Sequence, residues 1–268
     1  MRLASQNLAL TRRDDIDALP VAPFLNVRSI LSAALPELHH GDRWLLRGVA
    51  VAVCRNVRHV RGAEHVGIDR DPFILAINHS TRLEALALPA LLMLLRGGRR
   101  VHFLADWNFR IIPGVGLLYS RSGAITVMRK SAKPRVLNAL KPLFASPISS
   151  TEQARQHLIG GRSIGIFPEG TVNRDPECLL RGRFGAARLS LETGIAVVPT
   201  GLRFPAVPYG ENIPELSLMD ITFGPPLEPT PAMTLPAWHA AIMTAISVVS
   251  GKSWNHQRLD PSKGGDVL

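Results

Sequence analysis

The sequence predicts an α/β fold: a single domain with a mixed, largely parallel central sheet flanked by helices and preceded by an N-terminal amphipathic helical segment. The 268 residues suffice for one large domain with a substantial core. Short apolar runs typical of buried strands alternate with helix-patterned segments, which favours a sheet with a substantial parallel component. The expected strands are 73–77, 101–105, 124–128, 163–167, 195–199 and 219–223. The expected helices are 82–95, 133–144, 151–159, 180–192 and 235–249.

The chain divides into three parts. Residues 1–40 have weak periodicity and are expected to be partly ordered, residues 41–255 form the main domain, and residues 256–268 form a polar tail. One face of an expected helix near the start of the main domain is apolar. This face contains Trp44, Leu45, Gly48, Val49, Ala52 and Val53, while Arg43 and Arg47 lie elsewhere on the helix. The apolar face suits either a membrane surface or the protein's own core.

The charge predicts an anionic partner. The formal net charge is +10 and the pI is near 10.7, which favours lipid headgroups, nucleic acid or an acidic carrier. Aromatic residues make up only 6% of the chain, and no zinc-finger or RNA-binding signature is present, so nucleic acid is disfavoured. The two cysteines form no metal or redox motif and suit a reducing compartment.

Association with a membrane is expected to be peripheral. The longest apolar run, 85–95, contains a proline and is shorter than the roughly 20 residues that a spanning helix needs. The N-terminus has no signal-peptide pattern. We therefore expect a protein that lies on the cytoplasmic face of the membrane and contacts its anionic surface.

The segment NHSTRLE carries a candidate general base. Residues five apart on a helix are rotated by about 500°, so His79 and Glu84 cannot share a helical face. His79 is therefore expected in the turn after strand 73–77, with Glu84 in the first helical turn reaching back to the imidazole. The alternative is a capping box, in which Glu84 bonds the backbone amide of Thr81 instead of the histidine. The residues alone favour neither interpretation.

The segment FPEGT, residues 167–171, follows another expected strand. Pro168 fixes the exit of the chain and Gly170 permits close backbone approach, so the amides of 169–171 are candidates to bind a phosphate or an oxyanion. An ordinary turn would use the same residues. Arg129, at the end of strand 124–128, and Arg183, shortly after FPEGT, are candidate phosphate ligands, although solvated arginines would look the same.

Ser163 offers a competing interpretation. It lies in GRSIG, which matches the GxSxG pattern of serine hydrolases, with Asp175 or Asp220 and His239 or His256 as later partners. A nucleophile elbow requires a strand before the serine and a helix after it. Here the expected helix precedes the serine and the strand follows it, so a serine esterase is kept only as an alternative.

The chain resembles the glycerolipid acyltransferase family typified by 1-acylglycerol-3-phosphate acyltransferase. Four blocks carry the resemblance across residues 57–227: NHSTRLE, SGAITVMRK, FPEGT and IAVVPTGLRF. The resemblance implies an α/β enzyme in which a histidine and an acid activate an acceptor hydroxyl to attack the thioester of acyl-CoA or acyl carrier protein, without metal, cofactor or covalent acyl-enzyme. The implied residues are His79 and Glu84 for catalysis, Arg129, Glu169, Gly170 and Thr171 for the acceptor, and Val198 and Pro199 for the pocket.

Three departures from the family pattern bear on the predicted site. The first block ends in Glu84 where the family usually has Asp, and FPEGT is followed by Val172 where an Arg is usual, with Arg174 two residues later. Asp106 occupies a place where many members carry a Lys that meets the acceptor phosphate. A carboxylate 4 Å from a phosphate would cost about 1 to 4 kcal/mol.

The expected function is transfer of a fatty acyl group to the hydroxyl of a lyso-lipid. Lysophosphatidic acid ranks first as the acceptor, narrowly ahead of a non-phosphate acceptor such as a lyso-ornithine lipid or a natural product. A non-catalytic lipid-binding protein that retains the fold is a further alternative.

Overall fold

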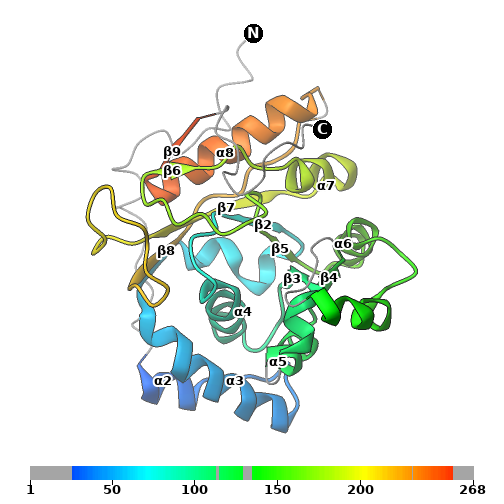
Figure 1. Ribbon diagram of the computed structural model, residues 1–268, viewed down its shortest axis with the longest axis vertical. Helices are drawn as coiled ribbons and strands as arrows, with labels where there is room; N and C mark the ends of the chain where they lie inside the picture. The colour runs from blue at the N-terminus through cyan, green and yellow to red at the C-terminus, as the bar shows by residue number, and fades with distance from the viewer. Residues whose placement is uncertain (1–25, 113–114, 129–134, 231, 256–268) are drawn as a thin grey trace.

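The computed structural model describes residues 26–112, 115–128, 135–230 and 232–255. Its centre is a seven-stranded sheet in the order β1-β8-β7-β2-β5-β3-β4 (Figure 1). These strands are β1 Val57–Arg61, β2 Ile74–Ile77, β3 His102–Asp106, β4 Ile125–Val127, β5 Ile164–Ile166, β7 Val197–Arg203 and β8 Met219–Phe223. A separate two-stranded sheet pairs β6, Cys178–Leu179, with β9, Ser253–Trp254.

The expected mixed, largely parallel sheet is confirmed. Strands β7, β2, β5, β3 and β4 run parallel to one another, whereas β8 is antiparallel to β7 and carries β1 parallel to itself. Because β2, β5 and β3 are parallel neighbours, the segments that follow Ile77, Ile166 and Asp106 all leave the same edge of the sheet. Ligands of open α/β sheets commonly bind at this carboxyl edge.

Two helical layers cover the sheet, and the alternation of side chains in β2 separates them. Leu75 and Ile77 pack in the core with α3 and α4, whereas Ile74 and Ala76 pack in the core with α6, α7 and α8. Figure 1 shows α7 and α8 on one side of the sheet and α4, with α2 and α3 beyond it, on the other. The helices are α2 Val27–Ser32, α3 His40–Val53, α4 Glu84–Leu95, α5 Val115–Arg121, α6 Ser150–Ile159, α7 Gly185–Thr193 and α8 Leu235–Ser250. The 3-10 helices are η1 Cys54–Asn56, η2 Ala63–Val66, η3 Ile68–Arg70, η4 Trp107–Ile111 and η5 Arg135–Phe144.

All six expected strands are present, and the expected and observed elements differ in other strands and in several helices. Strand β1 was not expected, because its charged residues interrupt the apolar pattern, yet Val57 and Val60 are buried. Helix α7 begins later than expected because residues 180–184 form the loop that follows β6. The described part of the expected helix 133–144 is the 3-10 helix η5, which contains Pro142. Helix α5 was missed.

The N-terminal residues join the main fold in part. Helix α2 lies inside the segment 1–40 and packs against α3, with Ile30 buried in the core. The polar tail 256–268 lies outside the described residues. The buried stripe of α3 is Leu46, Ala50 and Val53, whereas Trp44 is 58% exposed. A different face of α3 therefore packs in the core, and most of the apolar face that the sequence indicated stays accessible.

None of the helices in the described ranges combines the length and the apolar composition needed to cross a bilayer.

Candidate acyltransferase site

His79 and Glu84 form a hydrogen-bonded pair at the carboxyl edge of the sheet. The Nδ1 atom of His79 lies 3.0 Å from Oε2 of Glu84. His79 occupies the turn after β2, and Glu84 is the first residue of α4, as the five-residue spacing predicted. A carboxylate only accepts hydrogen bonds, so Nδ1 carries the proton and Nε2 remains free as a base. The His79 side chain is 16% exposed.

Glu84 also caps its own helix. Its carboxylate accepts hydrogen bonds from the Ser80 amide at 2.9 and 3.0 Å and from the Thr81 amide at 2.6 Å. Glu84 is 0% exposed, so these donors replace the water that a charged carboxylate loses on burial. The two interpretations left open by the sequence are therefore compatible: one side chain caps α4 and orients the imidazole. The extra methylene relative to Asp does not prevent the pairing.

The acid of FPEGT connects the second loop to the first. One oxygen of Glu169 accepts the His79 amide at 2.9 Å, and the other accepts the Leu180 amide at 2.9 Å and the Asn173 side chain at 2.8 Å. Burial raises the pKa of the Glu169 carboxyl, while these donors and the charge of Lys252 oppose the rise. Its oxygens therefore accept hydrogen bonds from groups of the protein. The assignment of Glu169 as a ligand of the acyl acceptor stays a prediction.

Further contacts fix the orientation of the histidine. The His79 ring stacks on Phe167 with 4.3 Å between ring centroids, and the His79 carbonyl accepts the Asn173 amide at 2.7 Å. Asn78 bonds both backbone groups of Leu202 on β7, at 2.7 and 3.2 Å. The turn that carries the base is therefore held by segments that follow β5 and by β7.

Two other predicted site residues, Arg183 and Thr171, lie in or beside the FPEGT loop. The Arg183 side chain lies against Gly170: a Cβ atom at Gly170, where φ is +68°, would be 2.6 Å from Nε. The Arg183 amide donates to the Pro168 carbonyl at 2.8 Å, which fixes this arginine beside FPEGT. Thr171 is partly exposed in the same loop. Arg129 lies outside the described residues.

Arg174 and Asp106, which belong to the departures from the family pattern, both form contacts near the His79 site. Arg174 pairs with Glu215 at 2.5 Å, and Glu215 also accepts the amides of Arg82 and Leu83 at the start of α4. Arg174 is therefore engaged in fixing this helix terminus. Asp106 ends β3 at the same edge as His79, and its carboxylate accepts the Asn108 amide at the start of η4.

Val198 and Pro199 lie in the strand next to β2. Both are buried in β7, where they align with Leu75 and Ala76 of β2. They lie in the strand beside the one that leads to His79.

Ser163 does not have the surroundings of a nucleophile. It is 0% exposed and stands before β5, at the edge of the sheet opposite to His79. Its hydroxyl accepts the Phe73 amide at 3.1 Å and donates to Asp71. The helix α6 precedes it and β5 follows it, so the geometry of a nucleophile elbow is absent at this serine.

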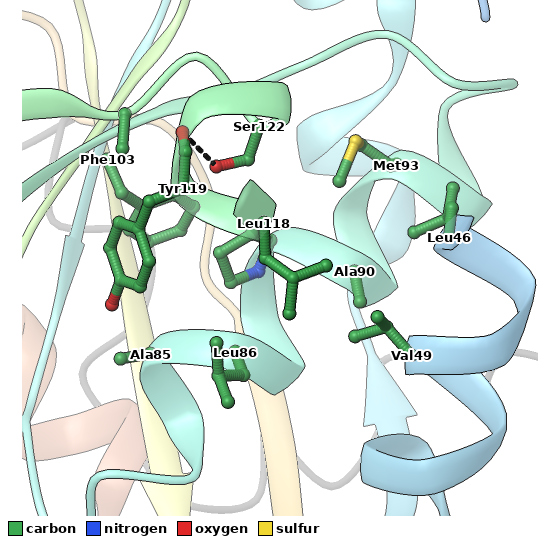
Figure 2. A pocket seen from close by; sticks show the side chains of 12 residues that line it. Leu46, Val49, Ala85, Leu86, Ala90, Met93, Phe103, Leu118, Tyr119 and Ser122 are labelled. Atoms are coloured by element: carbon green, nitrogen blue, oxygen red, sulfur yellow. Dashed lines mark hydrogen bonds between the residues drawn. The ribbon is translucent and has the colours of Figure 1, made fainter. Parts of the chain in front are cut away.

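An apolar pocket lies between α3, α4 and α5 (Figure 2). In Figure 2, Leu118 of α5 lies on one side of Ala90 of α4, and Leu46 and Val49 of α3 lie on the other. The ring centroid of Phe103, another lining residue, lies 6.0 Å from that of Phe167, which stacks on His79. The lining residues are Leu46, Val49, Ala85, Leu86, Pro89, Ala90, Met93, Phe103, Leu118, Tyr119, Ser122 and Ala124.

Comparison with known proteins agrees with this geometry. A family model described as Acyltransferase matches residues 56–203, which is more than half of the chain. The chain belongs to the acyltransferase family. The match contains the His79–Glu84 pair and FPEGT, and it confirms the resemblance found in the sequence.

Two individual proteins are similar to this acyltransferase chain. The 1-acyl-sn-glycerol-3-phosphate acyltransferase of Borreliella burgdorferi is 31% identical over 99 residues, which cover 37% of this chain and 34% of that protein. The chain thus aligns with only about a third of that relative's length. The crystal structure of the 1-acyl-sn-glycerophosphate acyltransferase PlsC from Thermotoga maritima superposes with a TM-score of 0.54 at 17% identity and covers 81% of this chain and 83% of that one. This structural similarity supports the fold.

Proposed function

We propose that the protein transfers a fatty acyl group from the thioester of acyl-CoA or acyl carrier protein to the hydroxyl of a lyso-lipid, with His79 as the general base. The observation that carries the proposal is the 3.0 Å contact between Nδ1 of His79 and Glu84, which leaves Nε2 as the basic nitrogen of a partly exposed ring. Glu84 holds the tautomer and stabilises the imidazolium that forms during the reaction.

The proton and the acyl group follow a balanced path. Nε2 of His79 takes the proton of the acceptor hydroxyl as its oxygen attacks the thioester carbonyl. The tetrahedral intermediate then expels the thiolate, which takes the proton from the imidazolium. The products are an ester and a free thiol, and the histidine returns to its starting state. Backbone amides of the FPEGT loop are the proposed donors to the oxyanion or to a phosphate.

The acceptor headgroup is proposed to lie beside FPEGT. Gly170 allows the Arg183 guanidinium to lie against the loop, and among the described residues no carboxylate forms an ion pair with Arg183. A phosphate near Gly170 and Thr171 would gain a charge-assisted hydrogen bond from this arginine. Glu169, which fixes the loop, and Arg129, which the sequence predicts as a phosphate ligand and which lies outside the described residues, complete the proposed acceptor site.

The acyl chain is proposed to enter the apolar pocket beside Phe103. Its volume of about 40 Å³ holds no more than a short part of a chain, so a long chain requires its lining side chains to move. Leu118 is partly exposed and lines the pocket. Leu118→Trp should shift the preference toward shorter acyl donors and Leu118→Ala toward longer ones, as measured with saturated donors of graded length. An identical preference in both variants would place the acyl chain elsewhere.

The membrane contact is proposed to involve α2 and α3 on the cytoplasmic face. Val27, Leu31 and Trp44 are exposed on these helices, and the Arg47 guanidinium lies 5.2 Å from the Trp44 ring centroid. Apolar and aromatic side chains beside cations suit an anionic lipid interface, where each cation contributes about 1 kcal/mol.

The substrate is tested with a panel of labelled reactants. Acyl-CoA and acyl carrier protein thioesters are each offered with lysophosphatidic acid, a lyso-ornithine lipid and neutral lysophospholipids, and the ester products are separated and counted. Selective acylation of lysophosphatidic acid is the expected result. Selective acylation of the lyso-ornithine lipid would favour the alternative acceptor, for which Asp106 at the same sheet edge is the motivating residue. No product with any pair would contradict the proposal.

A further inference from the structure

Lys252 is a buried cation next to the site. It follows Gly251, the residue that caps the C-terminus of α8, and is 2% exposed. In the sequence it lies far from both motifs and beyond residues 56–203, which the family model matches. Lysine is almost never fully buried without a partner, so its contacts require a physical reason.

Its ammonium group bridges the two segments that hold His79. The Nζ atom donates to the hydroxyl of Ser80 at 2.8 Å and to the backbone carbonyl of Asp175 at 2.8 Å. Ser80 directly follows His79, and Asp175 lies in the loop that follows FPEGT. Lys252 thus joins the turn after β2 to the loop after β5 from the side of α8.

Two buried carboxylates converge on the same turn. Glu169 accepts the amide of His79, and Glu84 accepts the amides of Ser80 and Thr81. Both glutamates are buried, and their carboxylates accept hydrogen bonds from the backbone amides of three consecutive residues, His79, Ser80 and Thr81. Hydrogen bonds offset part of the cost of burying such charges, and a nearby cation offsets more of it.

The charge of Lys252 acts on both carboxylates. Burial lowers the pKa of the Lys252 ammonium, and Glu169, Glu84, Asp175 and Cys178 oppose this shift in that order. Lys252 in turn lowers the pKa of Glu169, against the effect of burial. Among the described residues, these four groups are the acidic neighbours of the ammonium group.

We propose that Lys252 is a positioning residue: it holds the two loops of the His79 site together, and its charge offsets those of Glu84 and Glu169, which would otherwise favour the imidazolium form of His79. The inference deepens the proposed acyl transfer and depends on it for its activity readout. A serine–lysine catalytic dyad formed by Ser80 and Lys252 does not fit, because Ser80 is 0% exposed and cannot reach an acyl donor.

The test is the pH dependence of two readouts in Lys252→Met and Ser80→Ala. The first readout is kcat/KM for acyl transfer. The second needs no substrate: the rate at which diethyl pyrocarbonate modifies the His79 peptide, followed by mass spectrometry, since the reagent attacks only the neutral imidazole. Arg55→Met, at an exposed position, serves as the control for loss of one cation.

Loss of the Lys252 charge favours the imidazolium, so both profiles should move to higher pH by about half a unit or more in Lys252→Met. Ser80→Ala removes a hydrogen bond but keeps the charge, and its midpoint should match that of Arg55→Met and of the wild type. If Lys252→Met lowers the rates but leaves the midpoints of both pH profiles unchanged, Lys252 has only a structural role and the proposal is overturned.

If Lys252→Met does not fold, Glu169→Gln provides a second test, in which the pH profiles should shift in the opposite direction. Removal of this negative charge should move both profiles to lower pH, and an unchanged midpoint would contradict the charge balance. A wild-type protein that transfers no acyl group would refute the proposed function alone, because the shift in modification of His79 would still decide the role of Lys252.

Discussion

Glu84→Gln separates catalysis from helix capping. The amide oxygen of glutamine can still accept the Ser80 and Thr81 amides, as the carboxylate does. Its NH2 group, however, would face Nδ1 of His79, which the carboxylate contacts at 3.0 Å. A donor at this place forces Nδ1 to become the acceptor and moves the ring proton to Nε2, where the base is needed.

The expected loss of kcat is about 10² to 10⁴-fold, or roughly 3 to 5 kcal/mol in the activation barrier. The loss of unfolding free energy should be smaller, about 1 to 2 kcal/mol, because most of the capping survives. Acyl-transfer kinetics and urea unfolding measure the two quantities on the same preparation. Glu84→Asp keeps the charge with one methylene less and should lose only about tenfold in kcat. The reasoning fails if Glu84→Gln turns over within about threefold of the wild type.

Three further predictions follow. Ser163→Ala should leave kcat within about twofold but lower the unfolding free energy by about 1 to 2 kcal/mol, since its buried hydroxyl bonds two neighbouring groups; loss of activity in a folded variant would restore the esterase. Gly170→Ala should displace Arg183 and raise KM for a phosphate-bearing acceptor about tenfold, equivalent to about 1.4 kcal/mol, and unchanged KM would remove Arg183 from the acceptor site. Burial, His102 and the charge of Arg162 lower the pKa of His157 from 6.5 to about 4. Between these values the unfolded chain binds more protons, so stability should fall as the pH falls from 6.5 to 4, by at most about 2 kcal/mol after allowance for partial exposure. His157→Gln should flatten this part of the stability curve, and an unchanged slope would contradict the assignment.

The sheet was predictable because its central strands are uniformly apolar. Strand β2 is buried at all four positions, so its run stands out against the polar segments around it. Strand β1 escaped prediction because it lies at an edge and alternates charged with buried residues. The sequence did not decide whether the apolar face of α3 that contains Trp44 packs in the core or faces a membrane, and tertiary packing leaves Trp44 exposed.

The position of His79 before the helix was predictable from spacing, but the contacts that support the His79–Glu84 pair were not. A five-residue separation already requires the histidine to precede the helix, and parallel strands bring FPEGT to the same edge. That Glu169 accepts the His79 amide depends on loop geometry that no local pattern encodes. Lys252 lies in the short segment GKSW after the last helix, which carries no recognisable motif, and only the packing of α8 brings it to Ser80.

The most direct test of the account compares His79→Ala with the wild type in transfer of a labelled acyl group to the preferred lyso-lipid. The account predicts a loss of at least about a thousandfold in rate, with circular dichroism and binding to anionic vesicles unchanged. Equal transfer by the two proteins would contradict the assignment of the base. Vesicle binding by a wild-type protein that transfers no acyl group would instead identify a lipid-binding protein that keeps the fold without the chemistry.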